Sequence, residues 1–202
     1  MNKLEALRRT IECAKKYNDN LVNRSLLIIS RNTKTDQYKF TELYFYDRNF
    51  LHLTGVDTDI SASDFYSRCL NNNISLSDFE LDSYGHSTLK LDILPSILNK
   101  NLSAKIMGNF KDGRPMLKSK KIVGNVTACL GFDYDGSTNT LVPRTALKSD
   151  IRNEIDGQEQ VVAVFRRHID DSIYTECTYK AKKADATKIE FLPEYSYLKS
   201  LF

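Results

Sequence analysis

The chain of 202 residues contains no tryptophan, only three histidines and only four cysteines. Cys13, Cys69, Cys129 and Cys177 are far apart, and no C-x-x-C pair or Cys/His cluster occurs. A zinc or redox site therefore has no local signature. An even number of cysteines does not by itself predict disulfides, so we expect four reduced thiols, as is usual in the cytosol.

Long apolar runs are also missing from the sequence. No stretch approaches the roughly 18 apolar residues that a membrane-spanning helix needs. The N-terminal residues Met1–Arg9 lack the apolar region of a secretory signal peptide. We therefore expect a soluble, cytoplasmic protein without a membrane partner.

Several catalytic motifs are absent as well. The sequence has no phosphate-binding glycine loop, no HExxH, no G-x-S-x-G and no Asp/Glu cluster suited to two metal ions. We therefore expect no cofactor and no metal. A nuclease built from this chain would have to use histidine, hydroxyls and cations. Such chemistry suits RNA, whose 2′-hydroxyl is an internal nucleophile.

What the sequence does contain is typical of a globular protein. Hydrophobic residues make up 41% and charged residues 27%, with a formal net charge of +3. Residues 1–35 and 101–202 are basic, whereas residues 36–100 carry ten Asp/Glu against five Lys/Arg. This uneven charge favours a polyanionic partner only weakly.

Hydrophobic spacing predicts helices in the first half of the chain. Leu4, Leu7 and Ile11 indicate an amphipathic helix over residues 3–17, and we expect further helices over 61–71, 75–79 and 88–99, the last disturbed by Pro95. The polar residues 32–36 predict a hairpin loop between strands over 26–29 and 38–46.

The second half of the chain is rich in strand-forming residues. We expect strands over 104–110, 122–132, 160–169 and 173–180, with turns at 111–115 and 134–137 and a hairpin connector at 170–172. Helices followed by an antiparallel sheet are an α+β pattern. We expect one domain over residues 1–202: an N-terminal helical extension (1–22), a core (24–182) and a tail packed on the core (183–202).

One histidine segment is the leading candidate for chemistry. In Asn49–Val56, apolar residues surround His52, and Thr54 and Gly55 follow. We interpret the segment as a strand that ends in a glycine turn. Histidine exchanges protons near neutral pH, so His52 is a candidate acid or base. The alternative is a core histidine that hydrogen-bonds to the backbone.

Basic residues elsewhere supply candidate phosphate contacts. The stretch 105–121 carries six cations, among them Arg114 and Lys121, and is interpreted either as a solvated loop or as a phosphate-facing patch. Arg166, Arg167 and His168 end an apolar strand, where alternation places Arg166 and His168 on one face. Arg144 and Thr145 follow Pro143 and are interpreted as a loop.

Ordered sequence blocks show a resemblance to a known family. These blocks are Phe50–Gly55, Asp64–Tyr66, Leu76–Glu80, Lys90-Leu91 with Leu94-Pro95, Gly124–Val126 with Ala128–Phe132, Val142–Thr145 and Asp150–Arg152. From about residue 24 to residue 182 the chain resembles the fourth phage-associated family of the Barnase–EndoU–colicin–RelE superfamily of predicted ribonucleases. The His-Leu-Thr-Gly and Cys-Leu-Gly-Phe blocks are the most specific.

The resemblance implies helices packed on one antiparallel sheet with a cleft on its open side, and a context of phages, mobile elements and bacterial conflict. His52 and Thr54 match the family's histidine motif, and Arg144, Thr145 and Arg166 follow as nearby polar positions. Function still has to be argued from the site itself.

We therefore predict a metal-independent endoribonuclease that acts as a toxin-like effector. His52 would transfer protons, Thr54 would orient the substrate, and Arg144 and Arg166 would stabilise phosphate charge. Substrate-binding candidates are Lys121, Thr145, His168 and Arg114. RNA is the expected partner, with an antitoxin or other protein as a possible second one. The main alternative is an inactive relative that binds RNA or a protein.

Overall fold

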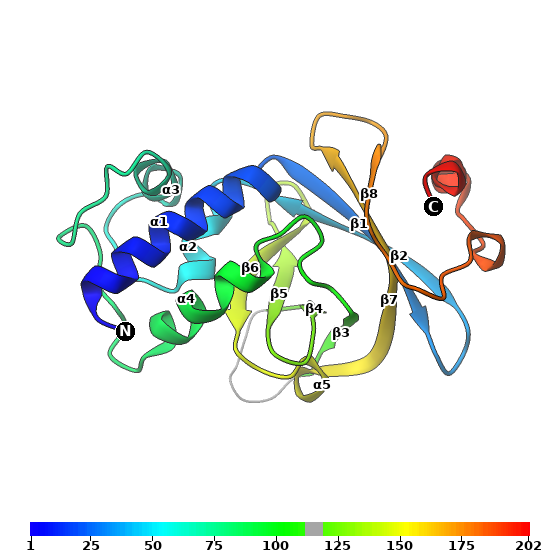
Figure 1. Ribbon diagram of the computed structural model, residues 1–202, viewed down its shortest axis with the longest axis horizontal. Helices are drawn as coiled ribbons and strands as arrows, with labels where there is room; N and C mark the ends of the chain where they lie inside the picture. The colour runs from blue at the N-terminus through cyan, green and yellow to red at the C-terminus, as the bar shows by residue number, and fades with distance from the viewer. Residues whose placement is uncertain (112–118) are drawn as a thin grey trace.

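Helices and an antiparallel sheet form the two layers of the molecule (Figure 1). The structure is a computed structural model, and it describes residues 1–111 and 119–202. The helices are α1 (Lys3–Asn20), α2 (Asn49–Thr54), α3 (Ala62–Leu70), α4 (His86–Ile97) and α5 (Ile151–Glu154), followed by the 3₁₀ helices η1 (Ala186–Lys188) and η2 (Pro193–Leu201). The strands are β1 (Arg24–Asn32), β2 (Tyr38–Phe45), β3 (Ile106–Phe110), β4 (Lys121–Gly124), β5 (Cys129–Tyr134), β6 (Leu141–Leu147), β7 (Ile155–His168) and β8 (Glu176–Lys180). The predicted α+β class is confirmed.

The strands join in the order β2-β1-β7-β3-β4-β5-β6, and every pairing among the described residues is antiparallel. β3 pairs with the first half of β7, and β8 pairs with its second half. The sheet curls until β2 and β6, the two ends of this order, come together. Phe45 on β2 and Phe132 on β5 meet edge to face there, with 5.9 Å between ring centroids.

The two largest apolar cores among the described residues lie on opposite faces of the sheet. The larger core packs α1, α2, α3 and α4 against the concave face and includes Tyr17, Phe50 and Phe65. The smaller core lies on the other face, where Leu27, Phe165 and Tyr174 pack against the C-terminal segment. From the C-terminal segment, Ile189 and Leu198 are buried in this second core.

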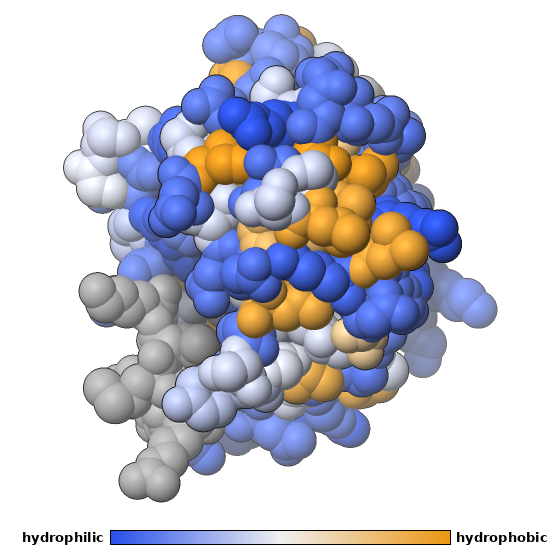
Figure 2. All heavy atoms as spheres, turned by 90° about the vertical axis from the view of Figure 1, so that its left-hand side faces the viewer, coloured by the Kyte–Doolittle hydropathy of each residue, from blue (hydrophilic) through white to orange (hydrophobic). Residues whose placement is uncertain are grey.

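The helical end also carries apolar side chains at its surface. Figure 2 views this end from the left of Figure 1 and shows apolar residues gathered between polar ones. Leu4 on α1 and Leu89 on α4 are each 47% exposed. No helix in the described parts of the chain is both long and apolar enough to span a bilayer.

Most predicted elements are present, and three of those outside the histidine segment and β6 differ in detail. Residues 75–79 form turns instead of a helix, because Asp78 accepts hydrogen bonds from the Ser75 amide (2.6 Å) and hydroxyl (2.7 Å). The predicted strand 122–132 is two strands, since Asn125 accepts bonds from the Thr127 and Ala128 amides and forms a turn. Pro95 lies inside α4, where it removes the amide that would bond to the Leu91 carbonyl, and the helix ends two residues later at Ile97.

Candidate functional site

The histidine segment forms a short helix, so the prediction of a strand was wrong. In α2, Phe50 and Leu53 are buried at a helical spacing of three, while His52 is exposed on the opposite side. The helix ends at Gly55, which adopts a left-handed φ of 67° that favours glycine. His52 thereby lies at the molecular surface, where a substrate can reach it.

Thr54 has a different environment from its neighbour. Its side chain is buried at 0% exposure. The hydroxyl donates to the Leu51 carbonyl at 2.8 Å and accepts from the Val56 amide at 3.4 Å. These bonds satisfy backbone groups at the end of α2. Thr54 therefore shapes the helix end and does not face substrate.

Arg144 lies on strand β6, so its interpretation as a loop residue was wrong. Gly131 on β5 pairs with Thr145, and the next residue, Phe132, pairs with Pro143. Arg144 is thus the extra residue of a β-bulge. Bulges redirect side chains and are common next to active sites.

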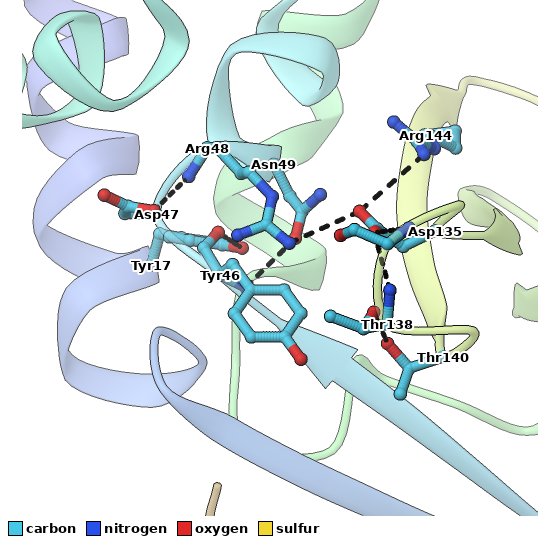
Figure 3. A network of polar contacts seen from close by, with 10 residues as sticks. Tyr17, Tyr46, Asp47, Arg48, Asn49, Asp135, Thr138, Thr140 and Arg144 are labelled. Carbon is cyan, nitrogen blue, oxygen red and sulfur yellow. Dashed lines mark hydrogen bonds and ion pairs between the residues drawn. The ribbon is translucent and has the colours of Figure 1, made fainter.

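A buried carboxylate joins Arg144 to a second arginine (Figure 3). Asp135, in the turn after β5, lies 3.3 Å from Arg48 and 4.0 Å from Arg144 between Oδ2 and the guanidinium nitrogens. The Asp135 side chain is only 10% exposed, whereas the Arg48 and Arg144 side chains are 41% and 33% exposed. The carboxylate therefore lies inside and both guanidinium groups reach solvent.

The β5–β6 turn holds Asp135 in its charged form. Its Oδ1 accepts from the Ser137 hydroxyl at 2.5 Å and from the Ser137 amide at 3.0 Å. These bonds, followed by the bonds from Arg48 and Thr138, keep the pKa of Asp135 well below its usual range against the opposing effect of burial. Asp135 is thus a permanent anion at neutral pH.

Two cations act on His52. Lys90 on α4 donates from Nζ to the His52 carbonyl at 3.3 Å. The pKa of His52 is lowered, first by partial desolvation and then by the positive charges of Arg144 and Lys90. Desolvation also lowers the pKa of Lys90. The His52 imidazole is therefore neutral at pH 7 and ready to accept a proton. We name Arg48, His52, Lys90, Asp135 and Arg144 the α2–β6 cluster.

Arg166 does not belong to this cluster. Its Nε donates to Glu176 on β8 at 2.8 Å, and Nη1 donates to the Asn20 carbonyl at the end of α1 at 3.2 Å. The Arg166 side chain is only 13% exposed. It joins β7, β8 and α1, which is a structural role.

The predicted substrate-binding residues are scattered. Lys121 donates to Asn109 at 2.6 Å, and its pKa is lowered by desolvation. Thr145 is buried at 6% exposure. His168 approaches Asp170 at the β7–β8 hairpin, with 3.4 Å between Nδ1 and Oδ2. Arg114 lies outside the described residues.

The sequence interpretation missed Arg48, Lys90 and Asp135 as members of the site. Arg48 directly precedes the histidine helix, and Asp135 opens the Asp-Gly-Ser turn, so both were visible as local signals. Only the closure of the sheet brings them together. Within residues 1–111 and 119–202, no three His, Cys, Asp or Glu side chains are grouped as metal ligands.

Comparison with known proteins gives one match. The family described as phage-Barnase-EndoU-ColicinE5/D-RelE like nuclease 4 matches residues 10–183 of the chain. No curated protein and no solved structure matches it significantly. The match covers all five residues of the α2–β6 cluster and ends before η1.

Proposed function

Because this chain belongs to the phage-Barnase-EndoU-ColicinE5/D-RelE like nuclease family, number 4, we propose that it cleaves RNA at the α2–β6 cluster by acid–base chemistry. One observation carries the proposal. The pKa of an exposed imidazole is lowered by desolvation and by the charges of nearby cations, and a buried carboxylate pairs with the cluster's two arginines.

In the proposed reaction His52 acts as the base. It takes the proton of the 2′-hydroxyl, and the freed oxygen attacks the adjacent phosphorus. The bond to the 5′-oxygen breaks, the leaving oxygen takes a proton from water, and a 2′,3′-cyclic phosphate forms. The resulting hydroxide takes up the proton that His52 releases, which restores the neutral imidazole. Arg144, Arg48 and Lys90 offset the charge that accumulates on the phosphoryl oxygens in the transition state.

His52→Ala tests this mechanism. We expect RNA cleavage in EDTA to fall by about 10²–10⁴-fold, the usual contribution of a positioned acid or base. His86→Ala is the matched control, because His86 is also exposed but lies on α4 beside Asp82. Gel analysis of total RNA and of a short oligoribonucleotide measures cleavage, and circular dichroism verifies the fold. Wild-type cleavage by His52→Ala would overturn the assignment.

A toxin-like role in phage or mobile-element conflict belongs to the same proposal. Its support is the family match, whose description includes the word phage. Induced expression of the wild-type chain in bacteria should stop growth, and His52→Ala should relieve the arrest. Co-expression of neighbouring genes in the same assay identifies a restraining antitoxin.

An inactive RNA- or protein-binding relative is the second candidate. The observation that favours it is the position of Arg166, which binds Glu176 and Asn20 instead of completing the cluster. RNA binding without cleavage by the wild-type chain, under every buffer tested, would support this candidate.

A further inference from the structure

A groove lies between the β1–β2 hairpin and the segment that follows β8. It consists of two cavities of about 720 Å³ and 340 Å³ that share Arg31, Tyr38 and Lys183 in their walls. The larger one lies within the roughly 300–1,000 Å³ of pockets that enclose small ligands. We name the two together the C-terminal groove.

Cations dominate the groove. Arg31, Lys39, Lys182, Lys183 and Lys188 line it. Three carboxylates also line it, so the ionisable side chains sum to a positive charge. The groove therefore favours an anionic ligand.

Two of the three carboxylates and two of the cations are already engaged within the protein, whereas the third carboxylate, Glu190, is exposed and forms no ion pair among the described residues. Asp36 pairs with Arg31. Asp185 caps η1 by accepting from the Thr187 amide at 3.0 Å and its hydroxyl at 2.7 Å. Lys39 pairs with Glu159, whose side chain is only 5% exposed. These contacts fix the positions of Arg31 and Lys39 before any ligand arrives.

Three lysines remain directed to the solvent side of the groove. Lys182, Lys183 and Lys188 are exposed, and none forms an ion pair with a carboxylate of the described residues. Tyr38 and Phe40 add aromatic rings to the same wall. Exposed lysines beside aromatic rings match a strand whose phosphates bind cations and whose bases stack.

The position of the groove separates it from the α2–β6 cluster. Its walls come from β1, β2, β7, β8 and residues 181–192, whereas the cluster lies on α2, α4, β6 and the flanking turns. The family match ends at residue 183, so Lys188 and the wall around η1 lie beyond it. The groove is therefore formed partly by residues inside the matched region and partly by residues beyond it.

We propose that the C-terminal groove binds single-stranded nucleic acid, with backbone phosphates on Lys182, Lys183 and Lys188 and a base stacked on Tyr38. The inference rests on the proposed function in one respect, because the bound strand is a flanking segment of the RNA substrate. Binding at the groove is independent of proton transfer at His52.

The test is a binding measurement with an uncleavable probe. A fluorescent, fully 2′-O-methylated RNA of about 12 nucleotides fits the usual site size of a single-strand groove. Its anisotropy is measured with the full-length chain in EDTA over a series of salt concentrations. The Lys183→Glu/Lys188→Glu variant should bind at least tenfold more weakly and lower the salt slope by about 1.4, the value for two lost phosphate contacts.

Arg8→Glu/Lys15→Glu is the matched control, since both residues are exposed on α1 and the charge change is the same. This control should retain wild-type affinity. Equal losses in both variants, or no loss in either, would overturn the groove assignment. Tyr38→Ala should weaken binding without changing the salt slope, because stacking releases no counterions; an unchanged affinity would contradict the stacking contact.

Competition assigns the ligand class. Unlabelled single-stranded RNA should displace the probe, whereas a duplex of the same sequence, a mononucleotide and polyglutamate should displace it at least tenfold less well. Equal displacement by any of these three overturns the assignment to single strands. Cleavage of a dinucleotide by Lys183→Glu/Lys188→Glu should match the wild type, so failure of this proposal is distinct from failure of the His52 mechanism.

Discussion

Two of the places where this molecule pairs arginine with a carboxylate are built in opposite ways. At the α2–β6 cluster the carboxylate of Asp135 is 10% exposed while Arg48 and Arg144 reach solvent. At the β7–β8 pair the arginine, Arg166, is 13% exposed and Glu176 is 39% exposed. Which partner is buried decides which charge an incoming ligand meets.

The difference separates a binding geometry from a structural one. At the cluster, a buried anion holds two cations at the surface, where a phosphate can contact them. At the β7–β8 pair, the buried cation uses its donors on Glu176 and the Asn20 carbonyl. An arginine near a strand end is therefore a poor indicator of function until its partners are known.

Among the tests of this comparison, the largest expected effect comes from neutralising the buried carboxylate of Asp135. Asp135→Asn keeps an acceptor for the Ser137 amide but loses the charge that positions Arg48 and Arg144. We expect kcat/KM for RNA cleavage to fall about 10²-fold, as when catalytic groups are displaced by about 1 Å. Steady-state kinetics on an oligoribonucleotide measures this change. A wild-type rate would show that Asp135 does not orient the arginines.

The corresponding carboxylate-to-amide substitution at the Arg166–Glu176 pair should lower the stability of the protein and leave the rate of RNA cleavage unchanged. Glu176→Gln removes the charge partner of the nearly buried Arg166. We expect a loss of about 1–3 kcal/mol in the free energy of unfolding, less than for a fully buried pair because Glu176 is partly exposed. Urea denaturation measures it. A large loss of kcat/KM at unchanged stability would place Arg166 in the site after all.

The smallest expected effect is a shift in the pH dependence of kcat/KM for RNA cleavage. Arg144 lowers the pKa of His52, after the larger effect of partial desolvation. Arg144→Gln should therefore raise the pKa of His52. Because a base must be unprotonated to act, the acidic limb of kcat/KM should move to higher pH, alongside a lower maximum rate.

Arg152→Gln is the control for this profile, since Arg152 is exposed on α5 and pairs with Asp150. Its acidic limb should coincide with that of the wild type. A limb that stays in place or moves to lower pH in Arg144→Gln would contradict the role of His52 as the base.

Much of the fold could be predicted from local sequence. The hairpin loop at 32–36, the connector at 170–172 and the α+β order depend on turn residues and hydrophobic spacing, which act over a few residues. The sequence could not show whether α2 is a helix or a strand. Its six residues are too few to distinguish the helical spacing of apolar residues from the alternation of a strand.

The site itself was only half predictable. His52 and Arg144 were identified by residue type and by resemblance, and the charge of Arg144 contributes to the lowered pKa of His52. Arg48 and Asp135 depend on the meeting of β2 with β6, which no local pattern encodes. Arg166 was placed on a face by alternation, but alternation does not say that Glu176 and Asn20 lie opposite.

The meeting of β2 with β6 also has a consequence for the time at which the site forms. The Arg48–Asp135 pair spans 87 residues of sequence, so it depends on a long loop closure and on a sheet with many non-local pairings. During synthesis Arg48 leaves the ribosome well before Asp135 and Arg144. The arginine pair therefore assembles late, and a nascent chain carries His52 for some time without Arg144.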